Sequence, residues 1–216
     1  MKFVVTAGPT REHLDPVRFL SNPSTGKMGF AVARAAARRG HDVVLVAGPV
    51  SLKTPKGVKR VDVTSAREML AAVEREMANA KSGSPAVFVA TAAVADWRPA
   101  KCAARKLKKG QMSDTLRLVR NPDILKTVAR RSGKNIVAVG FAAETNDVLA
   151  EARRKCREKN LDMIVANDVT EKGSGFGVDT NRVAFVRKDG SAERLPLMTK
   201  LAVARRIVRE CEDLCP

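Results

Sequence analysis

The sequence is poor in aromatic residues, cysteine and histidine, and each shortage argues against a class of site. It contains no tyrosine, one tryptophan, four cysteines and two histidines among 216 residues. No Cys-x-x-Cys motif occurs and neither histidine has a partner at metal-ligand spacing, which argues against a zinc site and a Ser-His-Asp triad. Four irregularly spaced cysteines do not make a disulfide framework either.

Long apolar runs are also missing. The apolar stretch from Met1 to Gly8 is too short for a signal peptide, and no later segment approaches the ~20 apolar residues that span a bilayer. Hydrophobic residues still make up 44% of the chain, which is enough for one domain-sized core. We therefore expect a single domain over residues 1–216 that is cytoplasmic and has no membrane partner.

Acidic residues are scarce relative to basic ones. The chain has 23 Asp and Glu against 40 Lys and Arg, a formal net charge of +17. Such an excess raises nucleic-acid binding as a hypothesis. However, the basic residues are spread along the whole chain, and aromatic residues, at 4%, offer few stacking platforms. The charge equally suits polyanionic small substrates, so a nucleic-acid partner is not expected.

Short apolar segments alternate with amphipathic ones along most of the chain. Strands are expected at 2–7, 42–47, 59–63, 85–90, 135–141 and 161–166, with a hairpin at 183–194. Helices are expected at 26–39, 65–80, 147–159 and 199–214, with another opening at 121. This order predicts a Rossmann-like α/β fold, a mostly parallel sheet with helices on both faces. The rhythm breaks at about 97–120, which we interpret as an inserted basic arm.

In open parallel sheets, ligands bind beyond the carboxyl ends of the strands. One such end leads into residues 18–29 (RFLSNPSTGKMG), where Ser24 or Thr25 is expected to cap the next helix. Lys27 stands in the first helical turn, against the helix dipole, and with the glycines and hydroxyls it indicates an anion site. Met28 rules out a P-loop, and the dinucleotide fingerprint is absent. An ordinary capped helix with a stray lysine is the alternative.

Other segments add weaker indications. The small residues from Thr91 to Asp96 let a ligand lie against the backbone, and Asp96 can hold a metal ion or a hydroxyl. Residues 106–110 (KLKKG) suit either a lid over phosphates or a solvated basic face. Lys155 and Lys159 share one helix face. Phe141 ends a strand and can pack on a nucleobase or in the core.

These segments, in this order and spacing, resemble phosphopantothenoylcysteine synthetase. The match begins at Thr6 and fades after Gly177. It runs through SNPSTGKMG, AGPVSLKTP, KRVDV, TAAVADWRP, KLKK, NPDIL, VGFAAETN and KNLDMIVANDV. In many bacteria this domain is fused behind a flavin-dependent decarboxylase. No such domain precedes Met1, so the expectation is a synthetase that stands alone.

The resemblance implies a two-step ligation in coenzyme A synthesis. CTP activates the carboxylate of 4′-phosphopantothenate as an acyl-cytidylate and releases diphosphate. L-cysteine then displaces CMP and gives 4′-phosphopantothenoylcysteine. Mg²⁺ is the implied cofactor because it offsets the triphosphate charge, although the sequence does not indicate its ligands. The resemblance also implies a homodimer with active sites near the subunit interface.

The resemblance further assigns residues. Asn22, which holds the acyl group, and Lys106, which acts on the cytidylate from the arm, are the expected catalytic residues. Arg18 is expected to reach substrate across the dimer, beside the substrate-binding residues Asn22, Ala92, Ala93 and Asp96. The expected nucleotide contacts are Gly8, Ser24, Gly26, Gly29, Ala90, Asp96, Lys106, Pro122, Asp123, Ile124, Leu125, Phe141, Lys155, Lys159 and Asn167. Trp97 and Pro23 depart from the family pattern without removing a polar group.

Three alternatives stay open from the sequence. The first is the same ligation with ATP in place of CTP. The second is a nicotinamide-dependent reductase on the same fold, which would require a glycine fingerprint after the first strand and usually a Tyr–Lys pair. The third is a basic nucleic-acid-binding module.

Overall fold

A computed structural model describes residues 1–80, 84–108, 110, 114–131, 135–144, 146–168, 170–171, 173–175 and 177–215, without the side chain of Arg131. Within these residues an eight-stranded sheet has the order β13-β12-β10-β9-β6-β1-β4-β5. The parallel strands are β1 (Lys2–Ala7), β4 (Asp42–Ala47), β5 (Val58–Asp62), β6 (Ala86–Ala90), β9 (Ile136–Glu144) and β10 (Met163–Asp168). The antiparallel edge consists of β12 (Val183–Arg187) and β13 (Ala192–Arg194). The predicted Rossmann-like α/β fold is confirmed.

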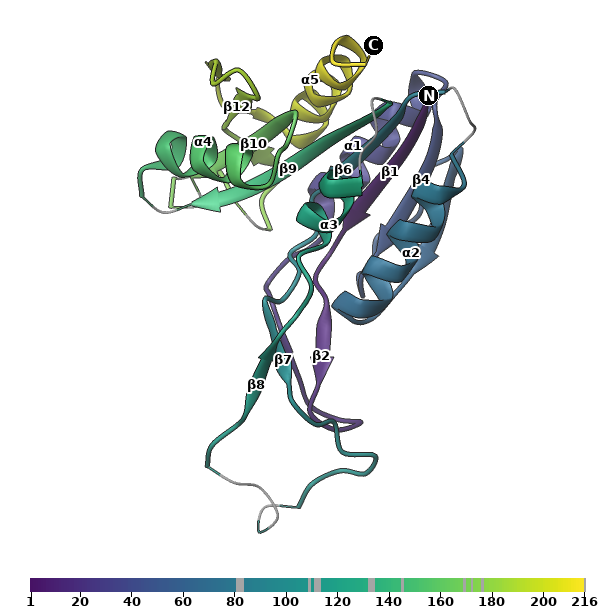
Figure 1. Ribbon diagram of the computed structural model, residues 1–216, viewed down its shortest axis with the longest axis vertical. Coiled ribbons are helices and arrows are strands. Elements are labelled where there is room, and N and C mark those ends of the chain that lie inside the picture. The colour runs from purple at the N-terminus through teal and green to yellow at the C-terminus, as the bar shows by residue number, and fades with distance from the viewer. Residues whose placement is uncertain are drawn as a thin grey trace.

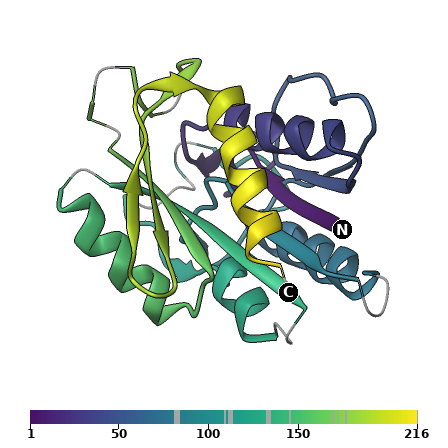
Figure 2. The same ribbon diagram turned by 90° about the horizontal axis from the view of Figure 1, so that it is seen from above.

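Helices cover both faces of the sheet. On one face α1 (Lys27–Arg38) and α5 (Lys200–Asp213) pack side by side (Figure 2) over a core that includes Phe3, Val5 and Phe185. The opposite face carries α2 (Ala66–Ala78), α3 (Ile124–Arg131) and α4 (Val148–Glu158). Successive residues of β1 enter opposite cores, as the period of a strand requires. No helix in the described ranges is both long and apolar enough to cross a membrane.

An arm extends from the carboxyl edge of the sheet (Figure 1). It combines the antiparallel pair β2 (Arg11–His13) and β3 (Phe19–Ser21) with a second pair, β7 (Trp97–Pro99) and β8 (Leu118–Arg120). The predicted arm at 97–120 is therefore present, although residues 109 and 111–113 of it lie outside the described residues. No strand was expected between β1 and α1, where β2 and β3 form. A smaller pair, β11 (Thr180–Asn181) and β14 (Met198–Thr199), precedes α5.

Candidate active site

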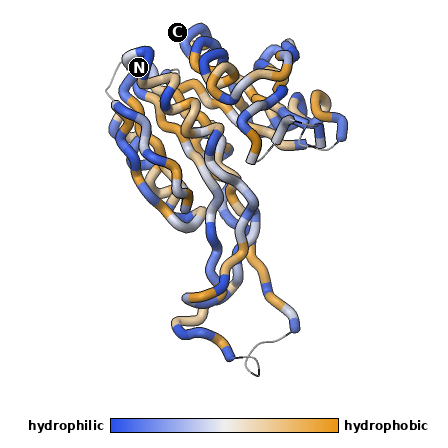
Figure 3. Tube along the Cα trace, turned by 180° about the vertical axis from the view of Figure 1, so that it is seen from behind, coloured by the Kyte–Doolittle hydropathy of each residue, from blue (hydrophilic) through white to orange (hydrophobic). Residues whose placement is uncertain are grey.

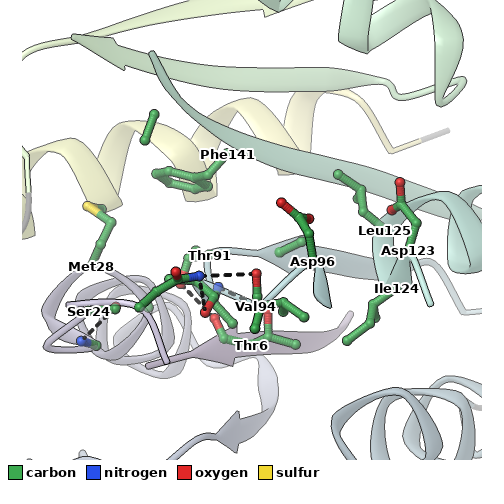
Figure 4. Close-up of a pocket in the computed structure, with 18 of the residues that line it drawn as sticks. Thr6, Ser24, Met28, Thr91, Val94, Asp96, Asp123, Ile124, Leu125 and Phe141 are labelled. Atoms are coloured by element: carbon green, nitrogen blue, oxygen red, sulfur yellow. Dashed lines mark hydrogen bonds between the residues drawn. The ribbon is translucent and has the colours of Figure 1, made fainter. Parts of the chain in front are cut away.

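A cavity of about 730 Å³ opens where the parallel strands end. Its walls come from the start of α1, the segment after β6, the entry to α3 and the ends of β9 and β10 (Figure 4). Chain segments far apart in the sequence meet here because the carboxyl ends of parallel strands share one edge of the sheet. The site predicted from the sequence therefore has a physical location.

The start of α1 presents backbone donors to this cavity. Gly26 is the N-cap residue, with φ of 77°, and no side chain caps the helix. The predicted cap at Ser24 or Thr25 was wrong, because the left-handed turn at Gly26 packs the loop against Gly8. The Ser24 hydroxyl instead accepts a hydrogen bond from the Gly26 N–H at 3.4 Å. With no acid in the first turn either, the positive end of the helix is suited to an anion.

Close packing brings α1 against the sheet at Gly29. A Cβ at this position would come within 2.5 Å of the Ala7 Cβ and 2.4 Å of the Thr91 hydroxyl. The same hydroxyl donates to the Thr6 carbonyl at 2.6 Å. Glycine is therefore needed for the helix to lie this close to β1, and the close approach fixes where its N-terminus faces the cavity.

Asn22 ties the loop before α1 to the segment after β6. Its side-chain nitrogen donates to the carbonyls of Ala93 and Val94, each at 3.2 Å. The Ala95 N–H is held in turn by the Thr10 hydroxyl at 3.0 Å. These contacts bring together Asn22 and the predicted substrate-binding residues Ala92, Ala93 and Asp96 on one wall.

The entry to α3 forms the opposite wall. The Asn121 side chain donates to the Ala95 carbonyl at 2.8 Å and so joins this wall to the first. Asp123 accepts from the Lys159 ammonium at 2.8 Å. Burial opposes its ionisation, but the Lys159 ammonium and the Lys126 N–H still hold the pKa of Asp123 below its ordinary value. Phe141 lines the cavity and also packs against the core, and its contact with a nucleobase stays a prediction.

Comparison with known proteins supports the same interpretation. Residues 1–214 match the family described as DNA/pantothenate metabolism flavoprotein C-terminal domain. The chain belongs to this family. It is 50% identical over 209 residues to the coenzyme A biosynthesis bifunctional protein CoaBC of Vibrio cholerae, and 49% identical over 213 residues to that of Escherichia coli K12. These alignments cover 96% and 97% of this chain but 51% of each relative, so the chain spans about half the length of the relatives.

A solved structure agrees with the family assignment. The crystal structure of the C-terminal domain of a CoaBC protein has a TM-score of 0.82 and 42% identity to this chain. The match covers 99% of this chain and 94% of that one. The whole arrangement of sheet, helices and arm is thus shared with the flavoprotein C-terminal domain family.

Most of the residues that the family resemblance assigns meet at the cavity. They are Asn22, Ser24, Gly26, Gly29, Ala90, Ala92, Ala93, Asp96, Pro122, Asp123, Ile124, Leu125, Phe141, Lys159 and Asn167. Gly8 lies behind the wall, in contact with Gly26 and Val50. Lys155 binds Glu144 and does not line the cavity. The functional roles of these residues stay predictions.

Sequence reasoning missed several cavity residues. Asn121, Asn181 and Lys200 line the wall but were not expected there. Lys200 carries a signal that was available, because it is a lysine in the first turn of a helix, as Lys27 is. For Asn121 and Asn181 the sequence offers no comparable signal.

The two arm residues do not reach the cavity of their own chain. Arg18 binds the buried carboxylate of Asp15 and donates to the Leu107 carbonyl at 2.9 Å. Leu107 also donates its N–H to Asp15 at 3.2 Å, so Lys106 follows the arm beside Arg18. Neither Arg18 nor Lys106 lines the cavity. For this member of the flavoprotein C-terminal domain family, the assigned arm residues and the pocket are separate within one chain.

Proposed function

We propose that this chain, as one domain, is a cytoplasmic phosphopantothenate–cysteine ligase that uses CTP. The observation that carries the proposal is that two features line one cavity: the start of α1, which no side chain caps, and Asn22, which is hydrogen-bonded to the Ala93 carbonyl. The first suits a polyphosphate and the second suits an acyl group, and the resemblance assigns them these same roles. Family membership and identities of about half to bacterial CoaBC proteins support the same activity.

The proposed reaction has two steps. The polyphosphate lies at the N–H groups of α1, where the helix dipole favours negative charge. The phosphopantothenate carboxylate attacks the α-phosphorus, the bond to diphosphate breaks, and an acyl-cytidylate forms. The amine of L-cysteine then attacks the acyl carbon, releases CMP and loses a proton. Asn22 is an uncharged residue at the junction, so it adds no repulsion between two anionic reactants.

Mg²⁺ fits the cavity as the implied cofactor. Asp96 and Asp123 line it, and carboxylate oxygens are hard ligands of the kind Mg²⁺ prefers. In the described part of the chain there is no cluster of three or more His, Cys, Asp or Glu side chains. A metal bound here would take its other ligands from phosphate and water, which is the usual mode for Mg²⁺, and it would neutralise developing phosphate charge.

The nucleotide preference is the finer part of the proposal. Phe141 and residues 122–125 lie on the wall where we propose that the base is held, and the family resemblance implies CTP. The test is a coupled assay of diphosphate release with phosphopantothenate, cysteine, Mg²⁺ and either CTP or ATP. We expect release with CTP that depends on phosphopantothenate. Release with ATP but not with CTP would show that ATP is the nucleotide of this ligase. Release with neither nucleotide would overturn the proposed function.

We further propose a homodimer in which the arm of one chain reaches the cavity of the other. Five of the eight large hydrophobic side chains that are exposed in the described ranges belong to the arm: Val17, Phe19, Trp97, Leu116 and Leu118. Figure 3 shows that hydrophobic segments occur along the projecting arm. Burial against a second copy would remove them from water. It would also bring Arg18 and Lys106 to the cavity of the second copy, since they do not line the cavity of their own chain.

A further inference from the structure

Two lysines on the cavity wall bind the chain that follows β10. The Lys200 ammonium donates to the carbonyls of Gly175 and Val178 at 2.9 and 2.6 Å. The Lys27 ammonium donates to the Gly177 carbonyl at 2.8 Å and to the Asp179 carboxylate at 2.7 Å. Both lysines line the cavity. Residues 175 and 177–179, which are distant in sequence from α1, are thus bound by two lysines of the cavity wall.

The two lysines differ in how freely they can change partner. Lys200 is 6% exposed and is fixed by carbonyls. Burial, and then the nearby Lys27 charge, lower the pKa of Lys200. The Lys27 side chain is 34% exposed and that of Asp179 is 87% exposed. An exposed ion pair contributes little net stability because water and salt compete for both partners, so the Lys27–Asp179 contact is easily exchanged.

The electrostatics at this corner favour an anion of higher charge than one carboxylate. The Asp179 carboxylate binds the Lys27 ammonium, which lowers the pKa of Asp179, and the nearby Lys200 charge acts in the same direction. The start of α1, which no side chain caps, adds a further positive end to the cavity wall. The cavity-lining carboxylates Asp96 and Asp123 come from other walls. A polyphosphate carries several negative charges and forms stronger charge-assisted hydrogen bonds at a lysine than an exposed carboxylate does.

We propose that Asp179 is an internal competitor of the nucleotide for Lys27. In the ligand-free protein the Asp179 carboxylate holds the Lys27 ammonium. An incoming polyphosphate displaces it, and Lys27 then binds the phosphate while Lys200 keeps Gly175 and Val178 in position. The inference rests on the proposed nucleotide function of the same cavity. Its consequence is a measured affinity below the intrinsic one, because part of the binding free energy goes into breaking the internal contact.

The competition is testable by calorimetric titration of inorganic triphosphate and of CTP at low salt. Asp179→Asn removes the competitor and should tighten the binding of both ligands about two- to fivefold, the range of an exposed ion pair. Lys27→Gln should weaken binding about tenfold, while Lys27→Arg keeps the charge and most of the affinity. Asp42→Asn is the matched control, since this exposed aspartate begins β4 at the opposite edge of the sheet.

The double variant Lys27→Gln/Asp179→Asn separates direct competition from a general field effect. Under the proposal Asp179→Asn changes nothing once Lys27 is neutral. Tightening that persists in the Lys27→Gln background would overturn it, and so would a single Asp179→Asn variant with unchanged or weaker affinity. Inorganic triphosphate carries no base and undergoes no ligation, so its affinity tests the role of Lys27 independently of the nucleotide and of the reaction. Failure of the ligase assay with a normal triphosphate result would therefore reject the proposed function alone.

Discussion

At the scale of single residues, a negative charge at Asn22 should abolish product formation. Asn22→Asp would set a carboxylate against the Ala93 and Val94 carbonyls that the amide now binds, and beside the acyl phosphate. We expect product formation to be abolished with the fold intact, measured by turnover and circular dichroism. Asn135→Asp, the same chemical change at the amino end of β9, is the control. Retention of more than about a tenth of wild-type turnover, a barrier change under ~1.4 kcal/mol, would contradict the role of Asn22.

Lys106 belongs to the arm, so its effect should appear after nucleotide binding. Lys106→Gln keeps the length and removes the charge. It should slow transfer to cysteine, with nearly unchanged CTP affinity, because a lid contributes mainly when closed. Single turnovers with labelled CTP, first without and then with cysteine, would show acyl-cytidylate accumulating. Lys101→Gln makes the same charge change elsewhere in the arm. If both half-reactions of the Lys106 variant keep wild-type rates, Lys106 is part of a solvated basic face.

At the scale of secondary-structure elements, the α1–β1 contact links the fold to the anion site. Gly29→Ala would force its Cβ into Ala7 and Thr91 and push α1 outward. We expect a loss of about 1–3 kcal/mol of unfolding free energy, together with weaker nucleotide binding, measured by denaturant unfolding and calorimetry. Gly110→Ala, where a Cβ would meet nothing within 4 Å, should change neither. Unaltered stability of the Gly29 variant would show that the helix can relax without cost.

Asp15, whose carboxylate is fully buried, lies in the turn between β2 and β3 and ties this turn to Leu107 of the arm. The Arg18 guanidinium, opposed by burial and helped by the N–H groups of Val17, Arg18 and Leu107, holds the pKa of Asp15 far below its usual range. Because this pKa lies below the unfolded value of about 3.9, ionised Asp15 stabilises the fold above about pH 4, and the contribution is lost as the pH falls further.

Asp15→Asn should therefore lower the unfolding temperature at pH 7, and its difference from wild type should narrow at pH 3. Thermal unfolding of both proteins across this range is the measurement. The exposed Asp42→Asn variant controls for the loss of one charge. A deficit as large at pH 3 as at pH 7 would mean that Asp15 acts through packing and not through its charge.

At the scale of the whole molecule, the exposed apolar arm and the separation of Lys106 from the cavity are the grounds for the proposed dimer. Val17→Glu alters a side chain that is 57% exposed in one chain, so it should spare the fold. It should shift the mass in light scattering toward the monomer and reduce ligation in parallel. Leu197→Glu, 43% exposed outside the arm, should leave the mass unchanged. A wild-type monomer mass at concentrations of full activity would rule out the dimer.

The net charge of +17 also acts at this scale. The proposed substrates, phosphopantothenate and CTP, and their intermediate are all anions, and a positive field would raise their local concentration at short range. Of the basic residues in the described ranges, four line the cavity: Lys27, Arg120, Lys159 and Lys200. The resemblance to the family does not account for the remaining excess.

The sequence alone determined the sheet and most of its elements, because runs of buried residues and helical periodicity are local signals. The strands at 2–7 and 42–47 have the predicted bounds, and the motifs of the α1 loop, the β6 end and the α3 entry pointed to one sheet edge. The β2–β3 hairpin was missed because each strand has three residues, too few to show a period.

Tertiary structure decided the rest. Gly26 replaces Ser24 or Thr25 as the N-cap, in a left-handed conformation and so close to Gly8 that a Cβ would come within 3.3 Å of the Gly8 nitrogen. Lys200 joins the cavity because α5 packs beside α1, a contact between segments far apart in the chain. The separation of Lys106 from the pocket depends on where the arm points. Local sequence encodes which residues can bind an anion, but their distances and partners are set by packing between distant elements, which no local pattern records.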